Sequence, residues 1–258
     1  MNIRGWRHRI STHIKDMARR QTPWYRKRPD LRGFNLSARD KHSAVSMEWG
    51  FTYIRIPKAA NSTVGMTLDH HFPGSGRTDR VGRRAYRKLS RLNGDEARRV
   101  FEEHFIFSVV RNPYHRILSA YLDKIAPGEE ARIGARFATE IRRSGGGDIT
   151  FNAFCRWLSR GGLNRDIHWI PQMDILSIVG FERLDYIGHV ETLQDDVPGI
   201  LRRIAGDKDI RSDLVRAGPR PTKAAEKCRH YYDEEAFDIV RTLYGQDFER
   251  LEYDDSRF

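Results

Sequence analysis

Two short apolar runs, each followed by a charged turn, stand out in the first half of the chain. FTYIRI at residues 51–56 is followed by PK, and FIFSVV at residues 105–110 is followed by RNP. Runs of this length, rich in β-branched and aromatic residues, are typical of buried strands. Helical patterns lie between and after them, and strands that alternate with helices predict parallel β-α-β units. We therefore expect an α/β fold with a central, mainly parallel sheet flanked by helices.

The second half of the chain has the spacing of helices. Residues 144–147, Ser-Gly-Gly-Gly, predict a break or loop before them. Thr150 can cap a helix whose apolar stripe is Phe151, Phe154 and Leu158. A last helix is predicted near the C-terminus and should stop at Gly245. Its apolar positions are Tyr232, Ala236, Val240 and Leu243.

The first 42 residues differ from the rest, because they are dense in Arg and Lys. We treat residues 1–42 as a basic leader and residues 43–258 as one domain. Apolar residues recur in the leader at helical spacing, at Ile3, Trp6, Ile10, Ile14 and Met17. The leader could be an amphipathic helix that docks on the body or contacts an anionic membrane surface. A loosely ordered tail is the alternative.

Composition and charge narrow the classes of partner. With 258 residues the chain can bury the core of one domain. The formal net charge of +11 favours acidic partners such as nucleic acid, anionic lipid, a charged polysaccharide or a phosphorylated nucleotide, although part of it can be a solvated surface. No apolar stretch approaches the roughly 20 residues of a membrane helix. The N-terminus lacks the apolar region of a secretory signal.

Two cysteines cannot form a disulfide framework, and no Cys/His spacing predicts a zinc site. We therefore expect no metal and a reducing setting, most simply the cytoplasm of a bacterium, with peripheral membrane contact through the leader as an added option.

The segment PKAANST, after the first predicted strand, has the composition of an anion-binding loop. Pro57 ends the strand because it cannot donate to the ladder. The loop residues are Lys58, Ala59, Ala60, Asn61, Ser62 and Thr63. Small residues let the backbone approach a ligand, and the amides that start the next helix attract phosphate-like oxyanions. The spacing is not that of a Walker A loop. Taken alone, an ordinary strand-helix turn with a surface lysine explains the segment equally well.

The second motif, VVRNPYHRILSAYLDK, favours the ligand-binding interpretation. It places Arg111 at the end of the second strand and starts a helix at Pro113. Arg111 and Ser119 can then converge on one phosphate above the helix start. Ligands of open α/β sheets bind at the carboxyl ends of the strands, and Lys58 and Arg111 both lie there if the strands are parallel. One ligand with two separated anionic groups would suit both motifs.

These two motifs resemble the cofactor motifs of the carbohydrate sulfotransferases, the Golgi-type enzymes and their bacterial relatives. Three later segments are also similar to that family: HWIPQ at 168–172, DYIGHVETLQDDV at 185–197 and the ending YYDEEAFDIVRTLYGQDFERLEYD. The resemblance spans roughly residues 50–254 and implies a single P-loop-like domain. It also implies a sulfotransferase that uses 3′-phosphoadenosine 5′-phosphosulfate (PAPS) without a metal. Ala60 and Asn61 replace the glycine or cysteine often found there, so we expect fewer unusual backbone angles in this loop.

The resemblance implies a role for each cofactor residue. Lys58 would hold the bridging oxygen and the 5′-phosphate, and the loop from Ala59 to Thr63 would bind the 5′-phosphosulfate. Arg111 and Ser119 would bind the 3′-phosphate. The basic segment GPRPTKAAEKCR precedes the last helix, and its Arg220 and Lys223 could close over the nucleotide; a solvated loop is the alternative. The implied acceptor is a hydroxyl of a carbohydrate or glycolipid.

A base must deprotonate that hydroxyl, and histidine suits the task. Our first candidate is His168, whose neighbour Trp169 could stack against a sugar. The second is the pair His70 and His71, about two turns into the helix after the loop. The carboxylates that could replace them are Glu102, Glu103 and Asp69. His168 could instead only shape its loop.

Two other functions remain open from the sequence. A P-loop-like nucleotide kinase would need a Walker A loop and an acidic strand end that binds metal, and neither pattern is present. A basic nucleic-acid-binding protein is the third class. No helix-turn-helix, RNA-recognition or zinc pattern supports it, so we expect no specific nucleic-acid partner.

Overall fold

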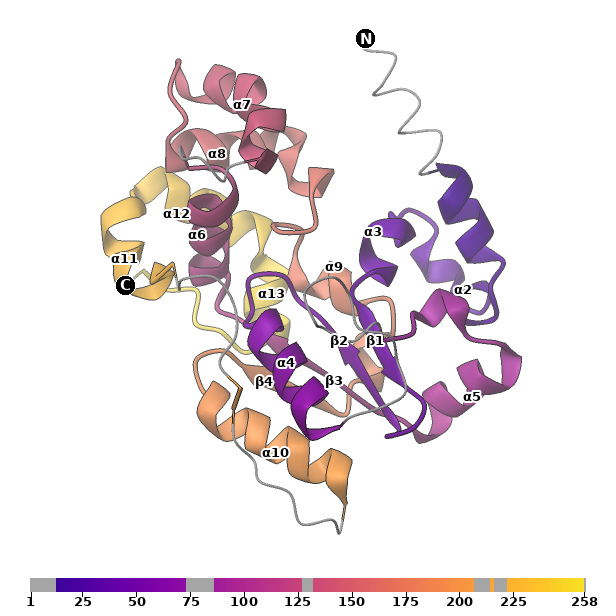
Figure 1. Cartoon of the computed structure of the whole chain (residues 1–258). Coiled ribbons are helices and arrows are strands. Elements are labelled where there is room, and N and C mark those ends of the chain that lie inside the picture. The colour runs from indigo at the N-terminus through magenta and orange to yellow at the C-terminus, as the bar shows by residue number, and fades with distance from the viewer. Residues whose placement is uncertain (1–12, 73–85, 127–131, 207–213, 216–221, 258) are drawn as a thin grey trace.

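The computed structural model describes residues 13–72, 86–126, 132–206, 214–215 and 222–257. Within these ranges four strands form one sheet in the order β1-β2-β3-β4 (Figure 1). The strands are β1 Ser43–Ser46, β2 Phe51–Ile54, β3 Phe105–Val110 and β4 Tyr186–His189. The β2-β3 and β3-β4 pairs are parallel, whereas β1 runs antiparallel to β2. The predicted α/β class with a mainly parallel sheet is confirmed.

Helices surround this sheet. They are α2 Pro23–Arg26, α3 Leu36–Asp40, α4 Asn61–His71, α5 Gly94–Glu103, α6 Pro113–Lys124, α7 Arg132–Gly145, α8 Phe151–Trp157, α9 Gln172–Leu176, α10 Leu193–Ala205, α11 Ala224–Tyr231, α12 Glu234–Leu243 and α13 Gly245–Arg250. Residues 13–20 are also helical. Short 3₁₀ turns span Pro29–Leu31, Leu89–Arg91, Leu163–Arg165 and Phe181–Arg183, and a π-helical turn spans Leu158–Gly162.

Each face of the sheet packs against its own set of helices, because successive side chains of a strand point to opposite faces. Tyr53 and Phe107 stack on one face, in a core that α4 and α10 complete. Ile54 and Ile106 face the opposite core, which contains residues of α2, α5 and α9. The sheet is therefore covered on both sides, as a parallel sheet requires.

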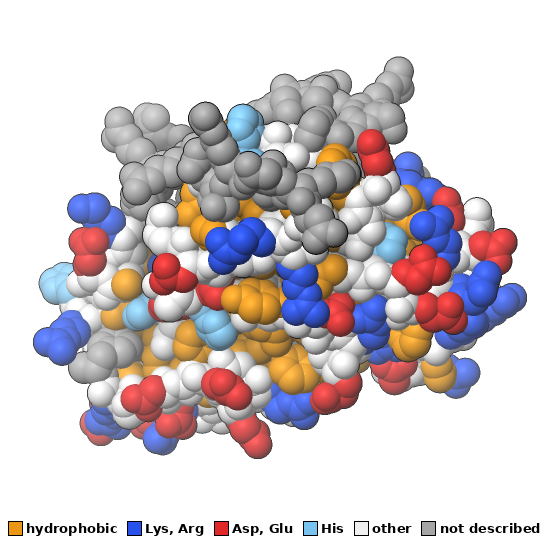
Figure 2. Space-filling model, turned by 90° about the horizontal axis from the view of Figure 1, so that it is seen from below, with side chains coloured by type: hydrophobic (Ala, Val, Ile, Leu, Met, Phe, Trp, Pro, Cys, Tyr) orange, Lys and Arg blue, Asp and Glu red, His pale blue; other side chains and the backbone are white. Residues whose placement is uncertain are grey.

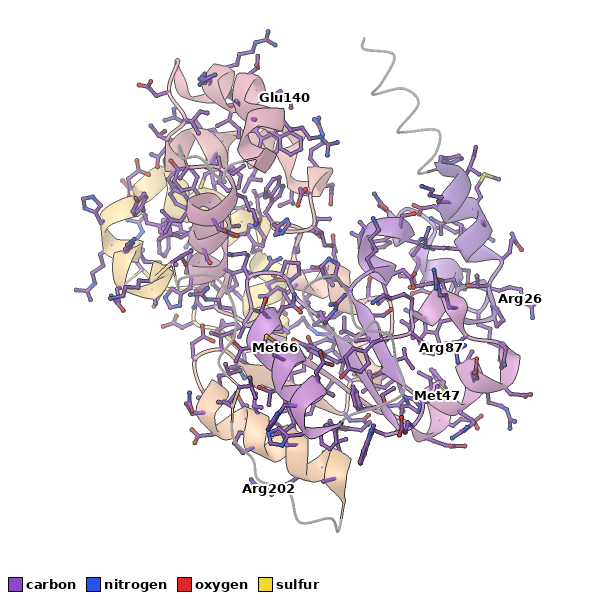
Figure 3. The ribbon with its side chains drawn as sticks, in the orientation of Figure 1. Arg26, Met47, Met66, Arg87, Glu140 and Arg202 are labelled. Atoms are coloured by element: carbon purple, nitrogen blue, oxygen red, sulfur yellow. The ribbon has the colours of Figure 1, made fainter. Side chains whose placement is uncertain are left out.

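A third core lies mainly between helices. It joins α6, α7, α8, α11 and α12, and Figure 1 shows them gathered to one side of the sheet. Aromatic rings fill it, and Phe154, Trp157 and Trp169 have ring centroids 5.5–6.0 Å apart. At its edge, Glu140 of α7, labelled in Figure 3, accepts a hydrogen bond from Trp157 Nε1 at 3.0 Å.

The described part of the basic leader docks on the body. The indole of Trp24 is buried, and its Nε1 donates to the carbonyl oxygen of Ile178 at 3.0 Å. Arg39 Nε donates to the carbonyl oxygen of Asp174 at 2.9 Å. Ile14 and Met17 of the predicted stripe are 60% and 56% exposed, so these two side chains do not make the contact. Its other members, Ile3, Trp6 and Ile10, lie outside the described residues.

Several local predictions are confirmed by the structure. The strand at 105–110 has the predicted bounds, whereas the strand predicted for 51–56 ends at Ile54. Thr150 caps α8, since its Oγ1 accepts a hydrogen bond from the amide of Ala153 at 3.1 Å. The stop predicted at Gly245 is only partly right. The helix ends at Leu243, but Gly245 begins another helix, α13, in place of a loop. Asp247 of α13 is buried and accepts the amide groups at the start of α9.

Trp24→Ala should show how strongly the leader is tied to the body. The substitution removes a buried indole and its hydrogen bond, so we expect the free energy of unfolding to fall by about 3 kcal/mol in urea titrations. Ile14→Ala is the control, because its side chain is exposed and should change stability by no more than about 0.5 kcal/mol. A loss below about 1 kcal/mol for Trp24→Ala would mean that the docking contributes little to the fold.

Candidate active site

The loop after β2 has an unusual backbone. Lys58 and Ala60 both take left-handed conformations, with φ of 69° and 50°. Non-glycine residues there cost of order 1–3 kcal/mol each, so neighbouring contacts must stabilise the loop. Arg116 Nε donates to the carbonyl oxygen of Pro57 at 3.0 Å, and Arg111 Nη1 donates to that of Lys58 at 3.2 Å. The expectation that alanine would limit the backbone angles of this loop was wrong, because Ala60 adopts the conformation usually left to glycine.

The left-handed Ala60 is also the N-cap of α4. An alanine has no side-chain acceptor for the first amides of the helix, which belong to Asn61, Ser62 and Thr63. All three residues are half-buried. A helix start with its partial positive charge, two hydroxyls and a carboxamide can therefore receive an oxyanion.

The side chain of Lys58 is paired with a carboxylate. Its Nζ lies 2.9 Å from Asp123 Oδ2, and the two side chains are 15% and 22% exposed. Lys124 Nζ lies 2.9 Å from the same oxygen. Burial lowers the pKa of Lys58, and Asp123 acts in the opposite direction. For Asp123, burial would raise the pKa, but the hydrogen bonds from Lys124 and Lys58 hold it below its usual value.

Arg111 lies directly after β3, at the sheet edge from which the Lys58 loop leaves β2. The hydrogen bond from Arg111 Nη1 to the carbonyl oxygen of Lys58 brings the two predicted cationic residues together. Burial lowers the pKa of Arg111, an effect opposed by Glu191. Its Nε is buried and has no hydrogen-bond partner among the described residues. A buried donor of this kind fits an anionic ligand, because leaving it unpaired costs free energy.

Ser119 lies on the face of α6 that points toward this region. Its hydroxyl is 3.0 Å from Thr222 Oγ1, which brings the segment before α11 to the predicted 3′-phosphate pair. The next residue, Lys223, has a 62% exposed side chain 3.8 Å from Glu226. Arg220, predicted beside it, lies outside the described residues.

His168 forms a tight pair with an acid. Its Nδ1 is 2.5 Å from Asp166 Oδ1, which also accepts the backbone amide of His168 at 3.1 Å. Burial would raise the pKa of Asp166, but these two hydrogen bonds hold it below its usual value. The side chain of His168 is 25% exposed. This geometry favours a proton on Nδ1, which leaves Nε2 as an acceptor.

His42 lies beside the carboxyl end of β2. The pKa of His42 is lowered to about 3, first by burial and then by the charges of Arg55 and His168. The carbonyl oxygen of His42 accepts the amide of Arg55 at 2.8 Å, and Arg55 directly follows β2.

Trp169 is not a sugar-stacking surface. Its side chain is completely buried in the helical core, and its Nε1 donates to the carbonyl oxygen of Gly162 at 3.0 Å. The prediction for this residue was wrong, because the apolar indole packs with Phe137, Phe154 and Trp157 instead of facing solvent.

The other base candidates lie elsewhere. His70 and His71 form the last turn of α4, roughly 14 Å along the axis from the helix start at a rise of about 1.5 Å per residue. Glu102 and Glu103 end α5 just before β3, at the amino edge of the sheet. Asp69 lies in the same last turn of α4.

Sequence reasoning missed several partners of the site. Asp123 pairs with Lys58, Gln172 holds the backbone of Arg111, and Glu191 accepts the amide of Asn112. The spacing of residues in α6 could have pointed to Asp123. Arg116, Ser119 and Asp123 are three or four residues apart and therefore share one face of this helix. The other contacts join segments that are far apart in the sequence, so no local pattern predicts them.

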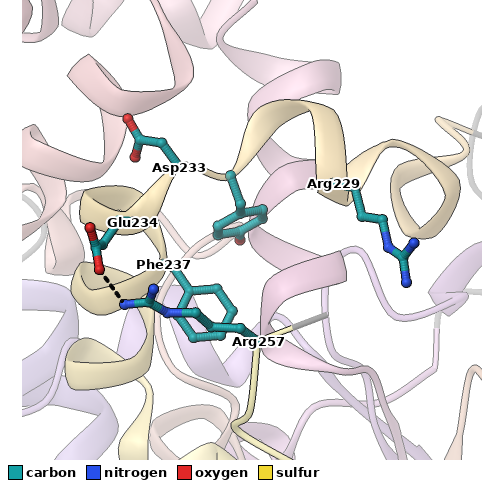
Figure 4. A pocket seen from close by; sticks show the side chains of 6 residues that line it. Arg229, Asp233, Glu234, Phe237 and Arg257 are labelled. Carbon is teal, nitrogen blue, oxygen red and sulfur yellow. Dashed lines mark ion pairs between the residues drawn. The ribbon is translucent and has the colours of Figure 1, made fainter.

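Two features of the described residues outside this loop are the mixed charge of one face and a pocket beside α12. On the face seen in Figure 2, Lys and Arg side chains are interspersed with Asp and Glu. A pocket of about 520 Å³, shown in Figure 4, contains Arg257 paired with Glu234 at 3.0 Å. None of the predicted site residues lines it; its lining is Arg229, Tyr232, Asp233, Glu234, Phe237 and Arg257. Within the described ranges, no three His, Cys, Asp or Glu side chains are grouped to hold a metal ion.

Comparisons with known proteins give a family match and distant relatives. The model of the sulfotransferase family matches residues 41–254. Carbohydrate sulfotransferase 14 from Danio rerio is 28% identical over 206 residues, 74% of this chain and 55% of the relative. Carbohydrate sulfotransferase 10 from Xenopus laevis is 28% identical over 184 residues, 63% of this chain and 50% of the relative. The chain thus spans about half the length of the curated relatives it matches. No solved structure matches it. No described helix is both long and apolar enough to cross a membrane.

Asp123→Asn should lower the pKa of Lys58 further. The carboxylate is the main group that opposes the effect of burial on Lys58, and the amide cannot replace its charge. The pKa can be followed by NMR titration of isotopically methylated lysines, with Lys58→Arg to assign the signal. Asp95→Asn, which alters an exposed pair with Arg98, is the control. An unchanged or raised pKa in Asp123→Asn would contradict the pairing.

Proposed function

We propose, from the premise that this chain belongs to the sulfotransferase family, that it transfers a sulfuryl group from PAPS to a hydroxyl of a carbohydrate or glycolipid. The observation that carries the proposal is the meeting of Lys58 and Arg111 at the carboxyl edge of parallel strands, beside the start of α4. Two cationic side chains and a helix N-terminus suit one ligand with separated anionic groups. The names of the relatives point to a glycan acceptor.

The residues of the candidate site fit PAPS as the sulfuryl donor. Lys58 and the loop from Ala59 to Thr63 would hold the 5′ end, where the left-handed backbone and the helix start present donors. Arg111 and Ser119 would hold the 3′-phosphate, for which the unpaired Nε of Arg111 is suited. Lys223 would lie at the rim beside Thr222, and Arg220 would join it from outside the described residues. PAPS would supply an activated sulfuryl group with a phosphate leaving group.

Catalysis would rest on positioning and charge. Lys58 would exchange its contact with Asp123 for the leaving phosphate and stabilise the charge that develops there. The amides at the start of α4 would add a fixed dipole in the same place. These groups can neutralise the leaving group without a metal, and a metal-free reaction is part of the proposal.

His168 is our candidate for the base that takes the proton of the acceptor hydroxyl. The carboxylate of Asp166 would fix the ring with its proton on Nδ1 and stabilise the imidazolium that forms. Nε2 would then accept the proton of the hydroxyl. His70 and His71 remain secondary candidates, and their place at the far end of α4 makes them less suitable.

The setting of the reaction is also a proposal. Cys155 and Cys228 are free and buried, which fits a reducing compartment such as a bacterial cytoplasm. Contact of the basic leader with an anionic membrane surface would bring the enzyme to a lipid-linked acceptor.

Lys58→Ala should keep the fold but lower turnover by roughly 10²–10³-fold, because a contact to the leaving group is lost. The measurement is transfer of ³⁵S from labelled PAPS to a panel of glycans. Lys27→Ala, at an exposed lysine, is the matched control. Turnover near the wild-type value in Lys58→Ala would refute the assignment of this loop. A wild-type protein stabilised by ATP with magnesium, and not by adenosine 3′,5′-bisphosphate, would refute the sulfotransferase activity itself.

His168→Ala should lower kcat by roughly 10²–10⁴-fold while nucleotide affinity stays within about twofold, because the base contacts the acceptor. A base must be unprotonated to act, so the wild-type rate should fall at acidic pH. This acidic limb should vanish in His168→Ala and persist in the control His13→Ala, at an exposed histidine. A His168→Ala variant that retains both its rate and the limb would assign the role to another residue.

A further inference from the structure

The chain leaves β3 through two peptides whose amides bind side chains. β3 ends at Val110, and the next amide, of Arg111, donates to Gln172 Oε1 at 3.0 Å. The amide of Asn112 donates to Glu191 Oε1, also at 3.0 Å. Both acceptors come from segments far along the chain. The backbone that carries Arg111 is therefore fixed by tertiary contacts.

Gln172 binds both the amide and the carbonyl group of Arg111. While its Oε1 accepts the amide of Arg111, its Nε2 donates to the carbonyl oxygen of Arg111 at 2.8 Å. One carboxamide thus satisfies the donor and the acceptor of a single residue. Gln172 has no exposed surface, so water does not compete for either bond. A paired contact of this kind restrains the position and also the rotation of the Arg111 backbone.

Gln172 is itself fixed by a buried acid. Asp247 Oδ2 accepts the amide of Gln172 at 2.8 Å, and Asp247 Oδ1 accepts that of Met173 at 2.9 Å. Asp247 is fully buried and belongs to α13, whereas Gln172 begins α9. The two segments resemble separate family motifs in the sequence, and here they form one support beneath Arg111.

The guanidinium of Arg111 has few other restraints. Its Nη1 reaches the carbonyl oxygen of Lys58, and its Nε has no partner among the described residues. The direction of the side chain therefore depends strongly on where its own backbone is held. A small displacement would move the guanidinium away from a phosphate while leaving the loop around Lys58 in place.

We propose that Gln172 is a positioning residue for nucleotide recognition, which directs Arg111 at the 3′-phosphate through the two hydrogen bonds to its backbone. This inference rests on the proposed function, since it needs a ligand with that phosphate. This role in nucleotide binding differs from the roles of His168 and Trp169, which belong to the same HWIPQ segment. It also assigns a role in binding to a segment in which we had expected only acceptor contacts.

The test is the affinity of two nucleotides that differ in one group, adenosine 3′,5′-bisphosphate and AMP, measured by calorimetry without turnover. Gln172→Met keeps the length of the side chain and removes both hydrogen bonds. We expect this substitution to weaken binding of the bisphosphate roughly tenfold, which is the scale on which partners that orient a binding residue act. The affinity for AMP should change by no more than about twofold. Arg111→Ala is the reference for complete loss of the preference for the bisphosphate over AMP. Gln194→Met, at an exposed glutamine of α10, is the matched control.

A purely structural role for Gln172 gives a different result. The melting temperature would fall in Gln172→Met, but the ratio of the two affinities would stay at the wild-type value, which would overturn the proposal. If Gln172→Met does not fold, Gln172→Glu is measured instead, because it keeps an acceptor and lacks the donor to Arg111. The preference should fall there as well. Loss of folding in both variants would show a structural role and would also overturn the proposal.

Failure of the proposed function has its own signature. A wild-type protein without preference for adenosine 3′,5′-bisphosphate over AMP would remove the 3′-phosphate site altogether. An intact wild-type preference that survives in Gln172→Met would instead refute only the role of Gln172.

Discussion

The parallel pairing of β2 with β3 is the constraint on which the site depends. The register joins Phe51 to Phe105 and Ile54 to Ser108, so both strands end at one edge of the sheet. The loop with Lys58 and the turn with Arg111 leave from that edge. The hydrogen bond from Arg111 to the carbonyl oxygen of Lys58 can form only because of this register. An antiparallel arrangement would place the two residues at opposite edges, and no local feature of either motif could reunite them.

Around this edge, polar side chains support the backbone. Arg116 is completely buried and contacts the carbonyl oxygen of Pro57, just before the two left-handed residues. Gln172 and Glu191 hold the amides that follow β3. Tyr253 donates to Glu191 Oε2 at 3.0 Å, so the C-terminal segment also takes part. Groups of this kind rarely add much stability, but they specify one arrangement of the two loops.

The sequence predicted what local patterns and strand direction determine. The two strands, the helices that begin at Asn61 and Pro113, and the Thr150 cap depend on residues close in the chain, and the structure contains them. The meeting of Lys58 and Arg111 needed one further assumption, that the strands are parallel. Trp169 shows the limit, because a tryptophan that follows a histidine and precedes Ile-Pro has no local feature that tells a buried ring from an exposed one. The contacts of Asp123 and Gln172 depend on how distant segments pack.

The contact between Lys58 and Asp123 has a consequence for selectivity. The carboxylate is part of the same chain, so its effective concentration at the lysine is far above that of any free anion. A small monovalent anion gains too little from Lys58 alone to displace it. A ligand that also engages the start of α4 and Arg111 brings several contacts at once and can compete. Asp123 thus competes with ligands for Lys58. This competition would disfavour small monovalent anions at the loop and favour ligands that carry several anionic groups.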